Sequence, residues 1–102
     1  MAAHVALVVR LVAKPGKEEV LKDFLAGARP LAEAERFTPV WFALRTAPDV
    51  FWIVDAFATD EDRDKHLSGE IAKALLGRAD ELLAEPPSIE KADVLAAKVV
   101  AS

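Results

Sequence analysis

Two β-rich runs, residues 37–45 and 50–58, carry apolar side chains on both faces, and no other feature constrains the fold as strongly. Pro48 and Asp49 between them favour a turn, so the runs pair most simply as an antiparallel hairpin. Alternate residues of a strand point to opposite faces of its sheet. Both alternating sets are apolar in each run. In the first run Val40, Phe42 and Leu44 lie on one face, and Trp41 and Ala43 lie on the other. In the second run Phe51, Ile53 and Phe57 lie on one face, and Val50, Trp52, Val54 and Ala56 lie on the other. A sheet built around this hairpin must be covered on both faces.

The segments before the hairpin predict one strand and one helix. Residues 4–13 are rich in Val and Leu at both parities and end at Pro15 and Gly16, as a strand with two buried faces would. A helix starts at Lys17, and Pro30 kinks or restarts it. Its apolar stripe is Val20, Phe24, Ala28 and Leu31.

The segments after the hairpin predict a second helical region and a last strand. Thr59 is a good N-cap with Asp62 three residues on, and it opens a short charged helix that stops near Ser68 and Gly69. A second helical stretch follows, and residues 89–100 form the last strand. The stripe of that stretch is Ile71, Leu75, Ala79 and Leu82. The order of elements predicts an α+β fold, the ferredoxin-like βαββαβ arrangement with a four-stranded antiparallel sheet.

This order also predicts an assembly. Two helices cover only one face of a four-stranded sheet, so the other face would expose a large apolar patch, which soluble monomers rarely tolerate. A second sheet, most simply that of an identical subunit, should cover it. We therefore expect a homodimer.

Composition limits the class of protein. The 102 residues suffice for a single domain, residues 1–102, and the net charge of −4 with interspersed signs argues against a nucleic-acid partner. The absence of cysteine removes disulfides and thiolate ligands and suits a reducing compartment. Residues 4–13 are too short for a membrane span, carry Arg10 and lack a signal cleavage site. We expect a cytoplasmic protein with no membrane partner.

Three stretches of the sequence resemble one family. Lys14 to Glu19, then Trp41 to Arg45, then Phe51 through Asp55 to His66 and Leu67 are similar to the antibiotic biosynthesis monooxygenase (ABM) family over nearly the whole chain. The resemblance implies a ferredoxin-like homodimer whose sheets face each other in a dimeric α+β barrel. It also implies a monooxygenase that oxidises a quinol-like or polyphenolic small molecule without metal, flavin or other cofactor.

The resemblance suggests roles for individual residues. Such an oxygenase needs a base, a group that stabilises an oxyanion, and a dry aromatic pocket. His66 is the candidate base, Asp55 a second catalytic candidate, and Arg10 the candidate for anion stabilisation. The residues expected to bind an aromatic substrate are Trp41, Phe42, Trp52 and Phe57. The anthrone-oxidising members also use a Tyr, and this sequence has none.

Other members of the family suggest other chemistry. Haem-degrading members use an Asn, a Trp and a haem-ligating His, where this chain has Val9, His66 and Leu76, so haem degradation is not expected. Another relative acts on a phosphorylated sugar, and an acid and a His leave isomerase chemistry open. A dimer that binds a small molecule without transforming it is the third alternative. A cavity lined by His66 and an aromatic residue would favour either enzyme over the binding dimer. A cavity that contains Arg10 and has no aromatic wall would favour the sugar isomerase.

The candidate residues also have purely structural interpretations. His66 has Asp62 and Glu70 four residues away on either side and could be an exposed helical His. Asp55 must be paired or near water, and an ion pair with Arg10 on the neighbouring strand would fix the strand register. Trp41 and Trp52 could serve core or dimer packing, and Arg63, Asp64 and Lys65 could form a solvated helix face.

Overall fold

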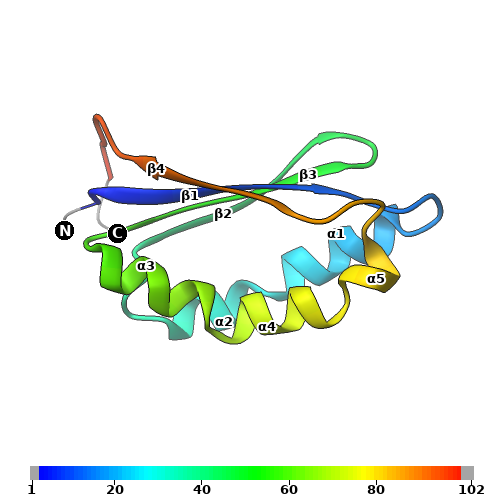
Figure 1. The fold of residues 1–102 in the computed structure, drawn as a ribbon, viewed down its shortest axis with the longest axis horizontal. Helices are drawn as coiled ribbons and strands as arrows, with labels where there is room; N and C mark the ends of the chain where they lie inside the picture. Colours follow the sequence, from blue (N-terminus) through cyan, green and yellow to red (C-terminus); the bar gives the residue numbers. More distant parts are fainter. Residues whose placement is uncertain (1–2, 100–102) are drawn as a thin grey trace.

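The computed structural model describes residues 3–99 as one antiparallel sheet with its helices packed on a single face (Figure 1). The sheet order is β2-β3-β1-β4. The elements are β1 (Val5–Val12), α1 (Glu18–Gly27), α2 (Arg29–Ala34), β2 (Val40–Ala47), β3 (Val50–Phe57), α3 (Asp60–Leu67), α4 (Glu70–Gly77), α5 (Ala79–Leu82) and β4 (Ser88–Asp93). The predicted ferredoxin-like α+β fold is confirmed.

Local sequence signals account for most element ends. Pro30 lies in the first turn of α2, so it restarts the helix, and Thr59 caps α3 by accepting a hydrogen bond from the backbone N–H of Asp62 at 3.1 Å. The predicted last strand was too long, because β4 ends at Asp93. Its neighbour β1 begins at Val5, which pairs with Asp93, and one further backbone hydrogen bond runs from the N–H of Val94 to the oxygen of His4 at 2.9 Å. Val100, the predicted end of the strand, lies outside the described residues.

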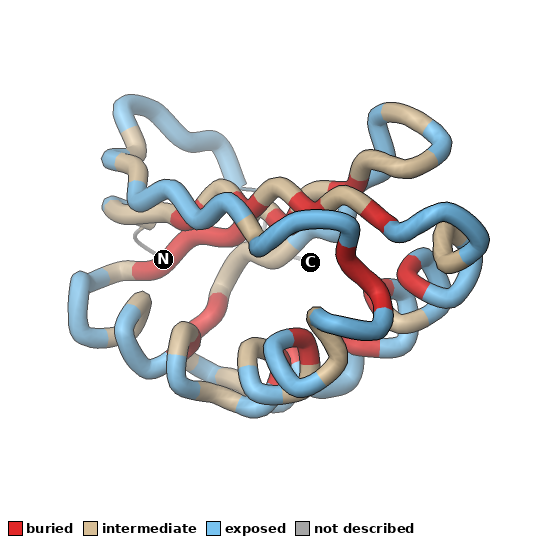
Figure 2. Tube along the Cα trace, turned by 45° about the vertical axis from the view of Figure 1, so that its right-hand side comes forward, coloured by how far each residue is buried: buried red, intermediate tan, exposed pale blue. Residues whose placement is uncertain are grey.

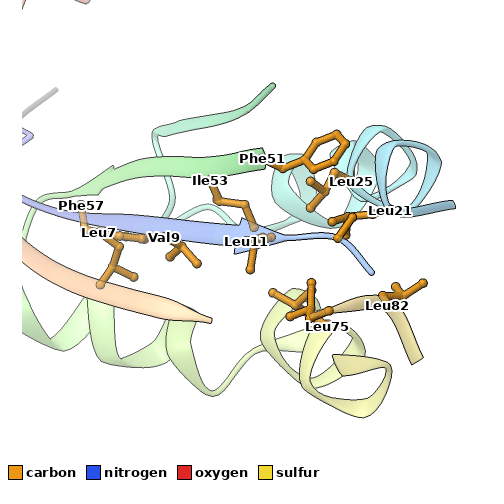
Figure 3. Close-up of a cluster of buried hydrophobic side chains, with 12 residues drawn as sticks. Leu7, Val9, Leu11, Leu21, Leu25, Phe51, Ile53, Phe57, Leu75 and Leu82 are labelled. Carbon is orange, nitrogen blue, oxygen red and sulfur yellow. The ribbon is translucent and has the colours of Figure 1, made fainter. Parts of the chain in front are cut away.

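The core fills the space between the sheet and the helices. Buried and partly exposed residues alternate along much of the central strands β1 and β3 (Figure 2), as expected where only one face meets the helix layer. Leu11, Leu21, Leu75 and Leu82 converge there from four different elements (Figure 3), and each is at most 5% exposed. Phe51 and Phe57 of β3 close the layer and are also buried.

The opposite face of the sheet carries no helix (Figure 1). Its residues on β2 include Phe42 and Leu44, which are 56% and 45% exposed. On β3 the same face carries Trp52, which lies beside Leu44 in the strand register. The predicted apolar character of both faces is therefore confirmed, whereas the predicted second subunit stays a prediction. None of the helices in residues 3–99 has the length and apolarity that crossing a membrane requires.

Candidate functional site

His66 lies near the end of α3 and points into the protein, with 5% of its surface exposed. Its ring packs against that of Phe57, with 5.2 Å between the ring centroids. The interpretation of His66 as an exposed helical residue is therefore wrong. Helix α3 ends at Leu67, so Glu70 belongs to the next helix and is not the partner that a continuous helix would supply.

Asp55 reaches His66 from the central strand β3. In the register Asp55 lies between Leu7 of β1 and Trp41 of β2, and it faces the helix layer with 1% exposure. Its Oδ2 is 2.9 Å from Nε2 of His66. The other carboxylate oxygen, Oδ1, receives no hydrogen bond from any described residue. Asp55 thus keeps free lone pairs in a buried position.

The predicted ion pair between Asp55 and Arg10 is wrong. Arg10 lies opposite Trp52 and therefore points to the helix-free face, whereas Asp55 points to the other face. The guanidinium of Arg10 instead lies 3.0 Å from the carboxylate of Glu85, and both side chains are largely exposed. The two charges therefore lie on opposite faces of the sheet, because alternate residues of a strand point to opposite faces.

Glu35 completes the site and was not predicted from the sequence. It follows α2, and its Oε1 lies 2.6 Å from Nδ1 of His66. The hydroxyl of Thr38 donates a hydrogen bond of 2.7 Å to the same oxygen. Only the turn that leads from α2 into β2 brings Glu35 to α3, and no local pattern reports such a contact. The result is a carboxylate, imidazole and carboxylate in line.

The environment raises the pKa of both Asp55 and His66. Burial raises the pKa of Asp55, against the opposing effect of the hydrogen bond and charge of His66. Burial alone would lower the pKa of His66, but the hydrogen bonds and charges of Asp55 and Glu35 outweigh it and raise the pKa. Both shifts favour retention of a proton between Asp55 and His66.

A cavity of about 60 Å³ lies beside this pair, between the sheet and α4. Asp55 and His66 contribute its polar side chains, and the remaining walls are aliphatic. These walls include Leu7, Val9, Ile53, Ile71 and Leu75. Leu76 and Ile89 also line it and are 57% and 47% exposed, so the cavity has an apolar rim at the surface.

The structure does not bring the other predicted binding residues to this cavity. Arg10, Phe42 and Trp52 point to the helix-free face, where the indole N–H of Trp52 donates to the hydroxyl of Thr46 at 2.8 Å. Phe57 belongs to the core and contacts the site through the His66 ring. Trp41 faces the helix layer and lines a separate hollow beside α2, together with Glu35.

Arg63 is another residue whose environment differs from the prediction of a solvated helix face. Its side chain is 11% exposed. The guanidinium donates to the backbone oxygens of Ala6 and Ala92, at 3.2 and 3.3 Å. Arg63 thus ties α3 to the edge pair β1 and β4.

The site geometry does not resemble a metal centre. The two carboxylates face opposite ring nitrogens of His66, so they do not converge on one point. Across residues 3–99 no group of three or more His, Cys, Asp or Glu side chains is arranged to hold a metal ion.

NE2512, a protein of known structure, is similar to this chain over nearly its whole length. No protein-family model and no functionally curated protein matches the chain. The crystal structure of NE2512, a protein of unknown function from Nitrosomonas europaea, has a TM-score of 0.96, is 53% identical and covers 98% of this chain and 97% of its own.

More distant structures share the fold. A protein from Nitrosomonas europaea provisionally named an antibiotic biosynthesis monooxygenase matches with a TM-score of 0.81 at 19% identity, over 90% of this chain and 99% of its own. One from Chloroflexus aurantiacus with the same provisional name matches with a TM-score of 0.75 at 16% identity, over 97% and 100%. The chain therefore has an ABM-like fold.

Proposed function

The chain belongs to the same family as the NE2512 protein, and we propose that it is a cofactor-independent monooxygenase that oxidises a small quinol-like aromatic substrate. One observation carries this proposal: the buried carboxylate of Asp55 lines an apolar cavity, with its Oδ2 against His66 and its Oδ1 without a hydrogen-bond partner among the described residues. Such a group is suited to take a proton from a ligand, because a bound hydroxyl would supply the missing hydrogen bond. The provisional names of the distant relatives agree with oxygenase chemistry.

Asp55, and not His66, is the group that contacts the substrate in this proposal. Both ring nitrogens of His66 face carboxylates, which leaves neither open to a ligand. Asp55 takes the proton of a ring hydroxyl, and the imidazolium of His66 keeps the carboxylate ionised until then. His66 is therefore the partner of the base.

The electrons for the reaction come from the substrate itself. The quinol anion gives electrons to dioxygen, and a bond forms between a ring carbon and one oxygen atom. The Asp55 proton returns to the outer oxygen and gives a hydroperoxide. The same ring carbon then loses its hydrogen as a proton while the bond between the two oxygens breaks, and the released hydroxide takes up this proton and leaves as water. A hydroxyquinone remains, so one oxygen atom of dioxygen enters the product and the other enters water.

The cavity selects the size of the substrate. A volume of about 60 Å³ takes the hydroxyl-bearing edge of a single ring, and the rest of the ring lies against the exposed Leu76 and Ile89. A polycyclic substrate, with its larger ring system, should react more slowly. The cavity lacks the aromatic wall expected for a stacked ligand, so aliphatic side chains hold the ring.

The sugar isomerase receives less support. A phosphorylated sugar needs a cationic partner for its phosphate, and Arg10 lies on the other face of the sheet. The cavity contains no Lys or Arg. Binding without catalysis is the remaining alternative and is an outcome of the experiment below.

We also propose that a second copy of the chain covers the helix-free face of the sheet. Phe42 and Leu44 expose large apolar surfaces there, and an identical sheet is apolar in the same way. The site residues lie on the opposite face, so each subunit carries a complete site. A monodisperse monomer at micromolar concentration in light scattering would contradict this assembly.

Oxygen uptake tests the proposed reaction. The purified protein, freed of metals and flavins, should accelerate oxygen uptake by a monocyclic hydroquinone more than uptake by a naphthohydroquinone. Asp55→Asn should lower the rate by roughly 100-fold, because it removes the positioned base. Glu61→Gln, a matched change at an exposed position of α3, should retain the parent rate.

Two results would decide against the proposal. Full activity of a folded Asp55→Asn variant would remove Asp55 from the reaction. A parent protein that binds hydroquinones but consumes no oxygen would favour the non-catalytic binding dimer.

A further inference from the structure

Glu35 holds one ring nitrogen of His66 in a fixed protonation state. Its Oε1 accepts a hydrogen bond from the hydroxyl of Thr38 and lies 2.6 Å from Nδ1 of His66. A carboxylate oxygen only accepts, so Nδ1 must carry a proton that it donates to Glu35. The proton shared between Nε2 and Asp55 is therefore the one that moves.

Gly69 leaves room for this carboxylate. A Cβ atom at Gly69 would lie 2.9 Å from Oε2 of Glu35, and 3.3 Å from the backbone oxygens of Lys65 and His66. The backbone of Gly69 is extended in ψ with φ at −86°, which other residues adopt freely. Glycine is thus needed here for space, so an added methyl group would displace Glu35.

Among the described residues, two charged groups contact the ring of His66. The titratable groups that face its ring are Asp55 from β3 and Glu35 from the segment after α2. Strand β1 and helix α4 contribute Leu7 and Ile71 to the cavity beside it. On its own helix, Asp62 pairs with Lys65 at 3.7 Å. The balance of charge at His66 is therefore set by two carboxylates.

We infer that Glu35 is a positioning residue that keeps the shared proton on His66, so that Asp55 stays ionised and ready to accept the substrate proton. Glu35 contacts His66 directly and Asp55 only through it, so its charge stabilises the imidazolium more than it destabilises the Asp55 carboxylate. Without Glu35 the shared proton moves to Asp55, which can then accept no other. This role rests on the proposed function only in the catalytic use of Asp55.

Nitrogen NMR of labelled histidine tests the role without any substrate. In the parent protein at neutral pH, both nitrogens of His66 should give imidazolium signals. In Glu35→Gln, His66 should give the signals of a neutral ring, and its protonation midpoint should fall. Glu33→Gln is the matched control, because Glu33 lies beside the same hollow and pairs with Arg29 instead.

Gly69→Ala provides a second variant that leaves Glu35 in the sequence. It should shift the His66 signals in the same direction, and it keeps the test decisive if Glu35→Gln does not fold. If His66 stays doubly protonated in the folded variants, Glu35 does not control the proton and the inference fails.

Kinetics separate this inference from the proposed function. Where the parent consumes oxygen, Glu35→Gln should lower kcat by about 10-fold or more with little change in KM, since Glu35 does not line the substrate cavity. A shifted NMR signature in a protein with no oxygenase activity would support the positioning role and reject the oxygenase. If the parent protein consumes oxygen but the His66 signals of Glu35→Gln are unchanged, the oxygenase proposal is supported and the positioning role of Glu35 is rejected.

Discussion

Replacing His66 by Leu tests whether Asp55 depends on its imidazole partner. The change keeps side-chain volume and apolar packing nearly constant, but it removes the group 2.9 Å from Oδ2. Asp55 then has 1% exposure and no cationic neighbour. An isolated buried carboxylate is so costly that the carboxyl group protonates instead.

The free-energy cost of protonating Asp55 determines how much stability the His66→Leu variant should lose. An ordinary carboxyl group has a pKa of about 3.9, so protonation costs up to about 4 kcal/mol at pH 7 and about 1.5 kcal/mol at pH 5. The variant should therefore lose up to about 1.4 kcal/mol of unfolding free energy for each pH unit in that range.

The parent protein depends on pH more weakly over the same range, because the hydrogen bond and charge of His66 oppose the rise in the pKa of Asp55 that burial causes. Its His66 has a raised pKa, so the stabilisation from the protonated ring is fully present below the ordinary His pKa of about 6.5. It is lost only as the pH rises through the folded-state pKa. The stability difference between parent and variant should accordingly widen from pH 5 to pH 7.

Urea unfolding at these two pH values, followed by tryptophan fluorescence, measures the difference. The double variant Asp55→Val with His66→Leu is the control, because replacing both partners by apolar residues removes the buried charge and should restore most of the stability. A folded His66→Leu protein that loses under about 1 kcal/mol at both pH values would refute the dependence of Asp55 on His66.

Three further variants test other contacts. Thr59→Ala removes the cap on Asp62 and should cost about 1 kcal/mol in thermal unfolding, and no cost would show that the cap is dispensable. Arg63→Met should lose about 1–3 kcal/mol and speed amide exchange in β4, whereas unchanged exchange would deny its link to Ala92. Phe42→Asp should convert the proposed dimer to monomer in light scattering, and an intact dimer would place the interface elsewhere.

The sequence predicted the fold because its signals are local. The β-rich runs on either side of the turn at Pro48 and Asp49, the break at Pro30 and the cap at Thr59 each act within a few residues, and the structure confirms the elements that they predict. The end of β4 was missed because strand length depends on the partner strand, and β1 begins at Val5, which pairs with Asp93.

The site was predicted in part, because it depends on contacts between distant segments. His66 and Asp55 were singled out as unusual residues, but their pairing required the orientation of α3 over the sheet. The pairing of Asp55 with Arg10 could have been rejected with the register alone, since Leu7 is the residue opposite Asp55. Glu35 gave no signal, because an acid near a helix end is typical of a solvated surface.

Stability alone does not explain why these three groups are buried together. Asp55 and His66 are at most 5% exposed, and the Glu35 side chain is 11% exposed. Replacing buried ionised groups by apolar residues of similar volume often leaves a protein equally stable or makes it more stable. Meanwhile burial raises the pKa of Asp55, and the two carboxylates raise the pKa of His66 against the effect of burial, so both groups favour retention of a proton beside an apolar cavity. A stability gain in the doubly apolar variant, together with loss of oxygen uptake, would show that the cluster is kept for proton transfer.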